Sequence, residues 1–174
     1  MIEETSLQSV LKEFRDYKTL GDKTFAQLEE KDFHFQPNLE CNSIATLIQH
    51  LHGNMLSRWT NFLTEDGEKE WRKRDDEFEV HSFSKEKLIQ LWEEGWKLVF
   101  DTIGSLKEDD LNKTIYIRSK PHSVIAAINR QLTHYAGHVG QIILLGKIIK
   151  AADWQTLSIP KGQSAIFSEK MMKK

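Results

Sequence analysis

Four long segments of this chain carry apolar residues at intervals of three and four positions, and this periodicity constrains the fold more than any other feature. The segments cover about residues 6–28, 43–62, 84–104 and 121–149. Such spacing gathers the apolar side chains on one face of an α-helix, and that face needs another helix to cover it. The three prolines lie outside the segment interiors, as expected for residues that interrupt helices: Pro37 between the first two segments, Pro121 at the start of the last and Pro160 beyond its end. The pattern therefore predicts an all-α fold, an antiparallel four-helix bundle.

Residues that start and stop helices stand at the segment boundaries. Asn42 and Ser43 are good N-caps for the second helix, and the third helix is predicted to start at Ser84. Gly104 is a candidate stop for the third helix, and Gly21 is a candidate for a kink in the first. The fourth helix is predicted to open at residues 121–123.

Two connections are longer than a simple bundle needs. Residues 64–83 are rich in charge, and residues 107–120 contain the alternating stretch 114–117. That alternation predicts a short β-like excursion between the third and fourth helices, half of a small hairpin. From Asp153 onward the pattern is not helical, which predicts an irregular C-terminal tail.

Length and composition predict one soluble domain over residues 1–174. Hydrophobic residues make up 39% of the 174 and charged residues 29%, and the net charge is −2. This charge offers no basic face for nucleic acid, and no apolar run approaches the roughly 20 residues of a membrane span. The N-terminus does not resemble a signal peptide, and a single cysteine excludes an intrachain disulfide. We expect a cytoplasmic protein that binds neither nucleic acid nor membrane.

Two histidines four residues apart, His134 and His138, are the strongest chemical signal in the sequence. Positions i and i+4 of a helix lie on the same face, so the two imidazoles can bind one metal ion. Zinc proteases of the His-Glu-x-x-His type place a general base directly after the first histidine. Tyr135 occupies that position here, so protease chemistry is not encoded. Such a pair also occurs by chance, and a metal site needs a third ligand.

The second predicted helix offers two candidates for that ligand, His50 and His52. They are separated by about 200° around the helix, so only one can face a given site. His52 lies nearer the centre of the apolar stripe, whereas His50 lies at its margin. His134 and His138 also flank their own stripe, which favours His50 only weakly. The remaining histidines, His34, His81 and His122, are expected to be solvated.

Six short motifs lie at residues 43–51, 53–60, 67–69, 72–78, 134–141 and 157–164. With these motifs the chain resembles, over nearly its whole length, the DinB superfamily of four-helix metalloproteins, and more closely its DUF1572 branch. The resemblance implies a DinB/YfiT-like bundle that holds a divalent metal ion through His50, His134 and His138. Relatives in the wider superfamily include isomerases and transferases that depend on a low-molecular-weight thiol.

The resemblance also implies a homodimer. Imidazole ligands suit zinc, nickel, iron or cobalt, and of these we expect zinc or nickel. Three neutral imidazoles leave at least one coordination position open, which is typical of catalytic sites. An ion held in this way can activate a thiol or a water molecule.

Arg58, Arg72 and Arg74 form a second cluster of interest. They are candidates for binding a carboxylate or phosphate of a substrate. The alternative, which we favour, is that they are solvated or pair with Asp75, Asp76 and Glu77 to hold the long connection in place. Cys41 is most simply a small buried residue.

Two functions remain open. The first is a metal-dependent enzyme, a thiol-dependent transferase or isomerase or a hydrolase, that acts on a small molecule. The second is a non-catalytic helical module in which a metal at most stabilises a homodimer.

Overall fold

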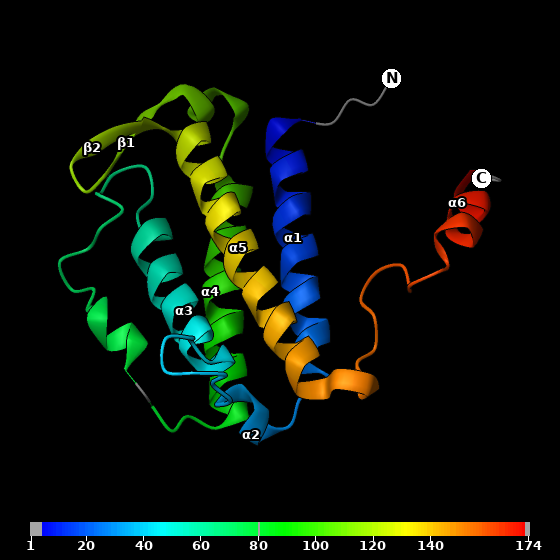
Figure 1. Cartoon of the computed structure of the whole chain (residues 1–174). Helices are drawn as coiled ribbons and strands as arrows, with labels where there is room; N and C mark the ends of the chain where they lie inside the picture. Colours follow the sequence, from blue (N-terminus) through cyan, green and yellow to red (C-terminus); the bar gives the residue numbers. More distant parts are fainter. Residues whose placement is uncertain (1–4, 80, 173–174) are drawn as a thin grey trace.

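The computed structural model describes residues 5–79 and 81–172. Residues 1–4, whose sequence argued against a signal peptide, and the last two residues of the predicted tail lie outside this part. The elements in chain order are α1 (Ser6–Phe25), α2 (Glu30–Phe33), α3 (Ile44–Trp59), the 3₁₀ helix η1 (Asp75–Phe78), α4 (Lys85–Ser105), the 3₁₀ helix η2 (Glu108–Asn112), β1 (Thr114–Ile117), β2 (Lys120–Ser123), α5 (Val124–Lys150), the 3₁₀ helix η3 (Ala151–Asp153) and α6 (Ser164–Met172). The four long helices pack as a bundle, which confirms the predicted fold class (Figure 1).

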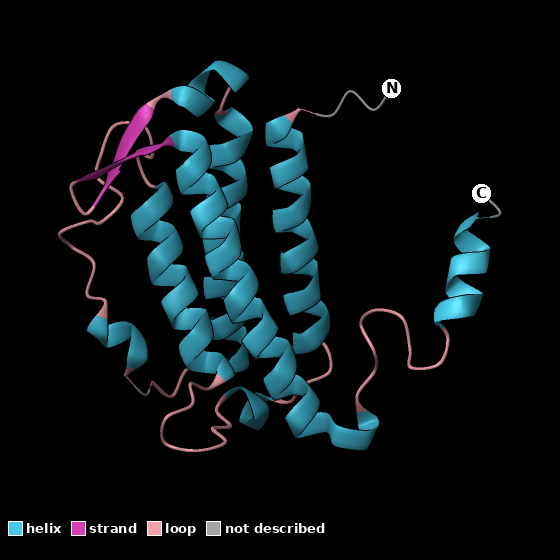
Figure 2. Ribbon diagram, turned by 45° about the horizontal axis from the view of Figure 1, so that its top comes forward, coloured by secondary structure: helices cyan, strands magenta, loops and turns pink. Residues whose placement is uncertain are grey.

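The bundle contains two helices in each direction, but not in simple alternation. α1 and α5 run one way, and α3 and α4 run the other way (Figure 1). The neighbours α3 and α4 are therefore parallel, and the Thr102 hydroxyl near the end of α4 donates to the carbonyl of Trp59 at the end of α3 (3.3 Å). Short loops alone would have made every consecutive pair antiparallel. Here the long connection 60–84 runs back along the bundle before α4 begins (Figure 2).

Serine side chains cap three of the four long helices at the predicted positions. The hydroxyls of Ser43, Ser84 and Ser123 accept hydrogen bonds from backbone N–H groups in the first turns of α3, α4 and α5. Each cap satisfies one of the N–H groups that a helix start leaves without a partner. The predicted helix starts are thus local consequences of the sequence.

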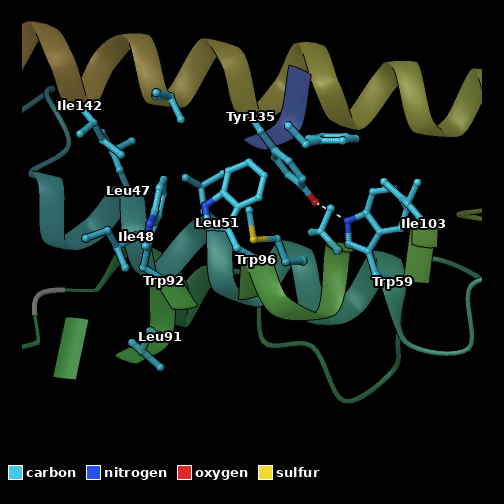
Figure 3. Packing of buried hydrophobic residues seen from close by; sticks show 14 of the residues in the cluster. Leu47, Ile48, Leu51, Trp59, Leu91, Trp92, Trp96, Ile103, Tyr135 and Ile142 are labelled. Atoms are coloured by element: carbon cyan, nitrogen blue, oxygen red, sulfur yellow. Dashed lines mark hydrogen bonds between the residues drawn. The ribbon is translucent and has the colours of Figure 1, made fainter. Parts of the chain in front are cut away.

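One aromatic side chain from each long helix meets at the centre of the bundle. The ring of Phe14 lies 5.9–6.1 Å from the rings of Trp59, Trp96 and Tyr135, at tilted to nearly perpendicular angles. Figure 3 shows Trp59 and Tyr135 with the hydrogen bond between them as a dashed line. Trp59 Nε1 donates to the Tyr135 hydroxyl (2.9 Å), which in turn donates to Asn54 Oδ1 (3.1 Å). These buried polar groups are all satisfied, so the contact fixes the rotation of α3 against α5.

The predicted kink at Gly21 is absent, and α1 continues through this residue to Phe25. A Cβ at Gly21 would lie 2.4 Å from Trp92 Cζ2. The glycine therefore allows close packing of α4 on α1 rather than bending the helix. The candidate stop at Gly104 lies within α4, which ends one residue later at Ser105.

The β-like excursion is a complete two-stranded antiparallel hairpin. β1 pairs with β2 in the register Thr114 with Ser123, so residues 121–123 lie in a strand; the fourth helix begins directly after them at Val124, with Ser123 as its N-cap. The turn residues Arg118 and Ser119 both have positive φ (55° and 59°), which is costly for side chains other than glycine and asparagine. Asp66 offsets this cost, because its carboxylate accepts from both turn N–H groups (2.8 and 2.7 Å).

Two helices were not predicted. The single turn α2 lies between α1 and α3. The predicted irregular tail is irregular from about residue 154 to 163, but it ends in α6, which stands apart from the bundle and has no buried residue (Figures 1 and 2). No helix in the described part combines the length and apolarity needed to cross a membrane.

Candidate metal centre

Three histidines from two facing helices meet at one point of the bundle. α3 supplies His50, and the last long helix, α5, supplies His134 and His138, each with one ring nitrogen within 4.8 Å of the others. His134 Nε2 lies 3.3 Å from His50 Nε2 and 3.0 Å from His138 Nε2. Two ligand nitrogens bound about 2.0–2.1 Å from one ion are separated by roughly 2.9–3.4 Å at tetrahedral or octahedral angles. The spacing of these atoms fits a shared ion.

The hydrogen bonds of the outer ring nitrogens determine whether the converging nitrogens carry lone pairs or protons. His50 Nδ1 donates to Glu77 Oε2 (2.9 Å), because an ionised carboxylate can only accept. His138 Nδ1 donates to the amide oxygen of Gln141 (3.0 Å). In the neutral rings both Nε2 atoms then carry lone pairs, and both face His134 Nε2. His134 can offer a proton to only one of them, whereas a cation would satisfy all three nitrogens.

Burial keeps the rings of His134 and His138 in the form that binds metal. It lowers the pKa of His134 to about 3, helped by the neighbouring His138 and His50 and by two arginines. Burial also lowers the pKa of His138, although its hydrogen bond to Gln141 acts in the opposite direction. Neutral imidazole is the ligand form, so no proton has to be displaced from these two rings at neutral pH.

Glu77 orients His50 and is itself held by an arginine. Arg72 donates to both of its carboxylate oxygens, from Nε (2.7 Å) and from Nη2 (2.8 Å). Burial raises the pKa of Glu77, but the bonds from His50 and Arg72 outweigh it and the net pKa is lowered. Gly53 makes room for this contact, since a Cβ there would lie 2.2 Å from Glu77 Oε1. Carboxylates that hold the far nitrogen of a histidine in this way tune its basicity as a ligand.

The histidines lie in a cavity of about 580 Å³. Five arginines line it together with Asn54, Phe78 and Gln131, and the arginines are Arg58, Arg72, Arg74, Arg118 and Arg130. No carboxylate is among the described lining residues. The cavity is therefore cationic before any metal binds.

The structure places all three arginines named from the sequence at this cavity, but in different states. Arg58 donates to Glu68 (2.9 Å) and to the carbonyl of Gly67, and Arg72 is held by Glu77. Both guanidinium groups are buried, so they build the wall. Arg74 is half-exposed and lies over the ring of Phe78 (5.1 Å).

The other residues weighed from the sequence lie away from the cluster. His52 is directed towards α4, where its Nε2 lies 3.4 Å from Glu94 Oε2. His34 Nε2 is 2.9 Å from the carbonyl of Phe83, and Cys41 is only partly buried, not fully as expected. Tyr135 is fully buried and its pKa is raised by burial, so it supports the core and not the chemistry.

Sequence reasoning missed Glu77 as a partner of His50 and did not single out Arg130. The spacing of Arg130, His134 and His138 at four-residue intervals was a usable signal for the arginine, since it aligns all three on one face of α5. No local pattern reveals Glu77, which lies 27 residues from His50.

Fold and site together define a class of protein: a helical bundle whose three-histidine cluster could hold a metal ion. A family model described as "Protein of unknown function (DUF1572)" matches residues 2–163. The chain belongs to this family. A search of curated proteins found no match to the chain.

Proposed function

We propose that this protein is a metal-dependent enzyme of the DinB-like type that binds a divalent ion, zinc or nickel, through His50, His134 and His138. The observation that carries the proposal is the convergence of three Nε2 atoms, two of them with fixed lone pairs, in the wall of a cavity large enough for a small molecule. Imidazole donors suit zinc and nickel well.

Three protein ligands without a fourth favour catalysis over a purely structural role. No other histidine, cysteine, aspartate or glutamate in the described part joins this group of ligand atoms. A bound ion would supply Lewis acidity, which lowers the pKa of a thiol or a water molecule at its open position. A low-molecular-weight thiol as co-substrate, and a transferase or isomerase reaction, follow from the resemblance to the DinB superfamily.

The chain's own residues would support this chemistry by position and charge. Glu77 holds the ring of His50 and keeps its Nε2 directed at the cluster. Gln141 does the same for His138. The arginines would attract an anionic reactant and stabilise negative charge that develops in the cavity.

Metal content of purified variants tests the proposal. Wild type, His50→Ala, His138→Ala and the matched control His52→Ala are reloaded with zinc and with nickel separately and analysed for bound metal. We expect close to one ion per chain in the wild type and in His52→Ala, and loss of the ion in the other two variants. A wild type that stays empty, or variants that all bind equally, would refute the site. Turnover of a thiol with electrophilic substrates is then screened on the loaded wild type.

A non-catalytic metal-binding homodimer is the second candidate. Helix α6 favours an association role, because it exposes Ile166, Phe167, Met171 and Met172 and none of its residues is buried in the described part of the chain. A nine-residue helix is too short to be stable alone in water, so it needs a partner surface. We propose a second copy of this chain as that partner. Sedimentation of the full chain beside a chain that ends at residue 160 tests it, and a monomeric full chain would refute it.

A further inference from the structure

We propose that the cavity contains a second subsite, which binds a carboxylate or phosphate group of a small molecule next to the histidine cluster. Its central residue is Arg130, with Arg74, Arg58 and Gln131 around it. The subsite deepens the proposed function, since its role in substrate binding rests on the metal-dependent activity proposed above. Its existence as an anion site rests on the arginines alone.

The two facing helices carry matching rows of residues into the cavity. On α3 the row is His50, Asn54 and Arg58, and on α5 it is His138, His134 and Arg130, each with four-residue spacing. The two helices run antiparallel (Figure 1). Both arginines therefore lie on the hairpin side of the histidines. One four-residue step corresponds to about 6 Å along the helix axis, which sets the distance scale between the anion group and the ion.

Two carboxylates pair with arginines on the buried side of the cavity and compensate part of their positive charge. Glu68 Oε2 accepts from Arg58 Nη2 and from Arg118 Nε (2.9 Å each), and Glu77 is bonded to Arg72. These ion pairs make the wall rigid, because hydrogen bonds to the carboxylates hold each planar guanidinium in one orientation. They do not neutralise the cavity, since three arginines share two carboxylates.

Two further arginines remain available for a ligand. The guanidinium of Arg130 is exposed and makes no hydrogen bond or ion pair with any residue in the described part of the chain. Among the described residues, the one ion-pair partner of Arg74 is Asp75 at 3.9 Å, and that carboxylate is fully exposed to solvent. An exposed pair at this distance contributes little, so Arg74 can turn to a stronger anion.

Two buried polar atoms of the lining residues point to the same conclusion. Arg58 Nε and Gln131 Oε1 have no hydrogen-bond partner among the described residues, although the two side chains belong to residues only 4% and 2% exposed. Buried polar atoms without partners are rare in folded proteins and often mark a ligand or a water site. Both residues line the cavity, so this part of its wall has hydrogen-bonding capacity that the described residues leave unused.

The chemistry of the donors defines the ligand class. A guanidinium binds carboxylate and phosphate through two parallel hydrogen bonds. The cavity volume of about 580 Å³ lies in the range of small-molecule sites. Five arginines line this one cavity, whereas the chain as a whole has a net charge of −2, which favours a small anion over nucleic acid.

Calorimetric titration of the zinc-loaded full chain with inorganic phosphate and with succinate tests the proposal. We compare wild type with Arg130→Gln, Arg130→Lys and the matched control Arg15→Gln, an exposed arginine of α1 that does not line the cavity. Loss of a charge-assisted bond is expected to weaken binding by roughly 10-fold to 100-fold in Arg130→Gln. Arg130→Lys keeps the positive charge but not the two parallel donors of the guanidinium, so its affinity should lie between those of wild type and Arg130→Gln. Arg15→Gln should bind as tightly as wild type. The preferred probe tells whether the subsite selects phosphate or carboxylate.

The same titrations on His138→Ala separate this subsite from the metal. If anion binding persists there and still depends on Arg130, the subsite stands whether or not the wild type binds zinc. If Arg130→Gln binds both probes as tightly as wild type, or wild type binds neither at millimolar concentrations, the subsite is refuted even when the metal centre is present.

Discussion

Replacing Glu77 by glutamine tests whether the loop-borne carboxylate tunes the histidine cluster. Its oxygens accept three hydrogen bonds, from His50 Nδ1 (2.9 Å), Arg72 Nε (2.7 Å) and Arg72 Nη2 (2.8 Å). A glutamine of the same shape offers one acceptor atom and one NH₂ group. At least one of the three donors then faces another donor in a buried site.

The expected loss has two parts that can be measured separately. Removing the partner of a metal-binding histidine typically costs 10-fold to 100-fold in affinity, or about 1.4–2.7 kcal/mol. Leaving the buried Arg72 without its main ion pair destabilises the fold by roughly 3 kcal/mol, the lower end of the usual range, because Glu68 remains 3.5 Å away. In a domain of this size that lowers the melting temperature by roughly 6–12 °C.

Competition with a chromogenic zinc chelator gives the affinity, at a temperature where circular dichroism shows both proteins folded. Thermal melts of the metal-free proteins give the stability. Glu94→Gln is the matched control, because Glu94 lies near His52 and not near the cluster. Zinc affinity unchanged in Glu77→Gln, or lowered equally in Glu94→Gln, would refute the role assigned to Glu77.

Three further outcomes follow from the same geometry. Gly53→Ala should displace Glu77 and weaken zinc binding in the chelator assay, whereas Gly104→Ala, where an added Cβ meets nothing within 4 Å, should not; equal effects would contradict the close contact. The metal-free protein should lose stability as pH falls from about 6.5 towards about 3. In this range His134 becomes protonated in the unfolded chain, whereas its lowered pKa keeps it neutral in the folded chain. Measured by urea unfolding, the free energy of unfolding should depend less steeply on pH in His134→Gln than in wild type. An equally steep dependence would refute the lowered pKa of His134. Asp66→Asn removes one of two acceptors for the strained hairpin turn and should cost about 1–2 kcal/mol by urea unfolding, with the hairpin amides exchanging faster; unchanged exchange would argue against this anchor.

Features with local causes could be predicted from the sequence. The periodicity of apolar residues placed the four long helices, and Ser43, Ser84 and Ser123 marked three of their starts because capping involves only the next few residues. The pair His134 and His138 shared a face for the same reason. Helix α6 could not be found this way, because its apolar residues form no stripe and none of them is buried among the described residues.

The amino-acid sequence by itself thus determined the helices, their apolar faces and one pair of converging imidazoles. Only the tertiary structure decided that His50 and not His52 completes the cluster, since that depends on how α3 is rotated against α5 by the contact of Trp59 with Tyr135. It also decided that Glu77 meets His50 across 27 residues of chain. Hydrogen bonds within a helix act over a few residues, whereas the course of a long connection is fixed by packing and ion pairs that form only when distant segments have come together.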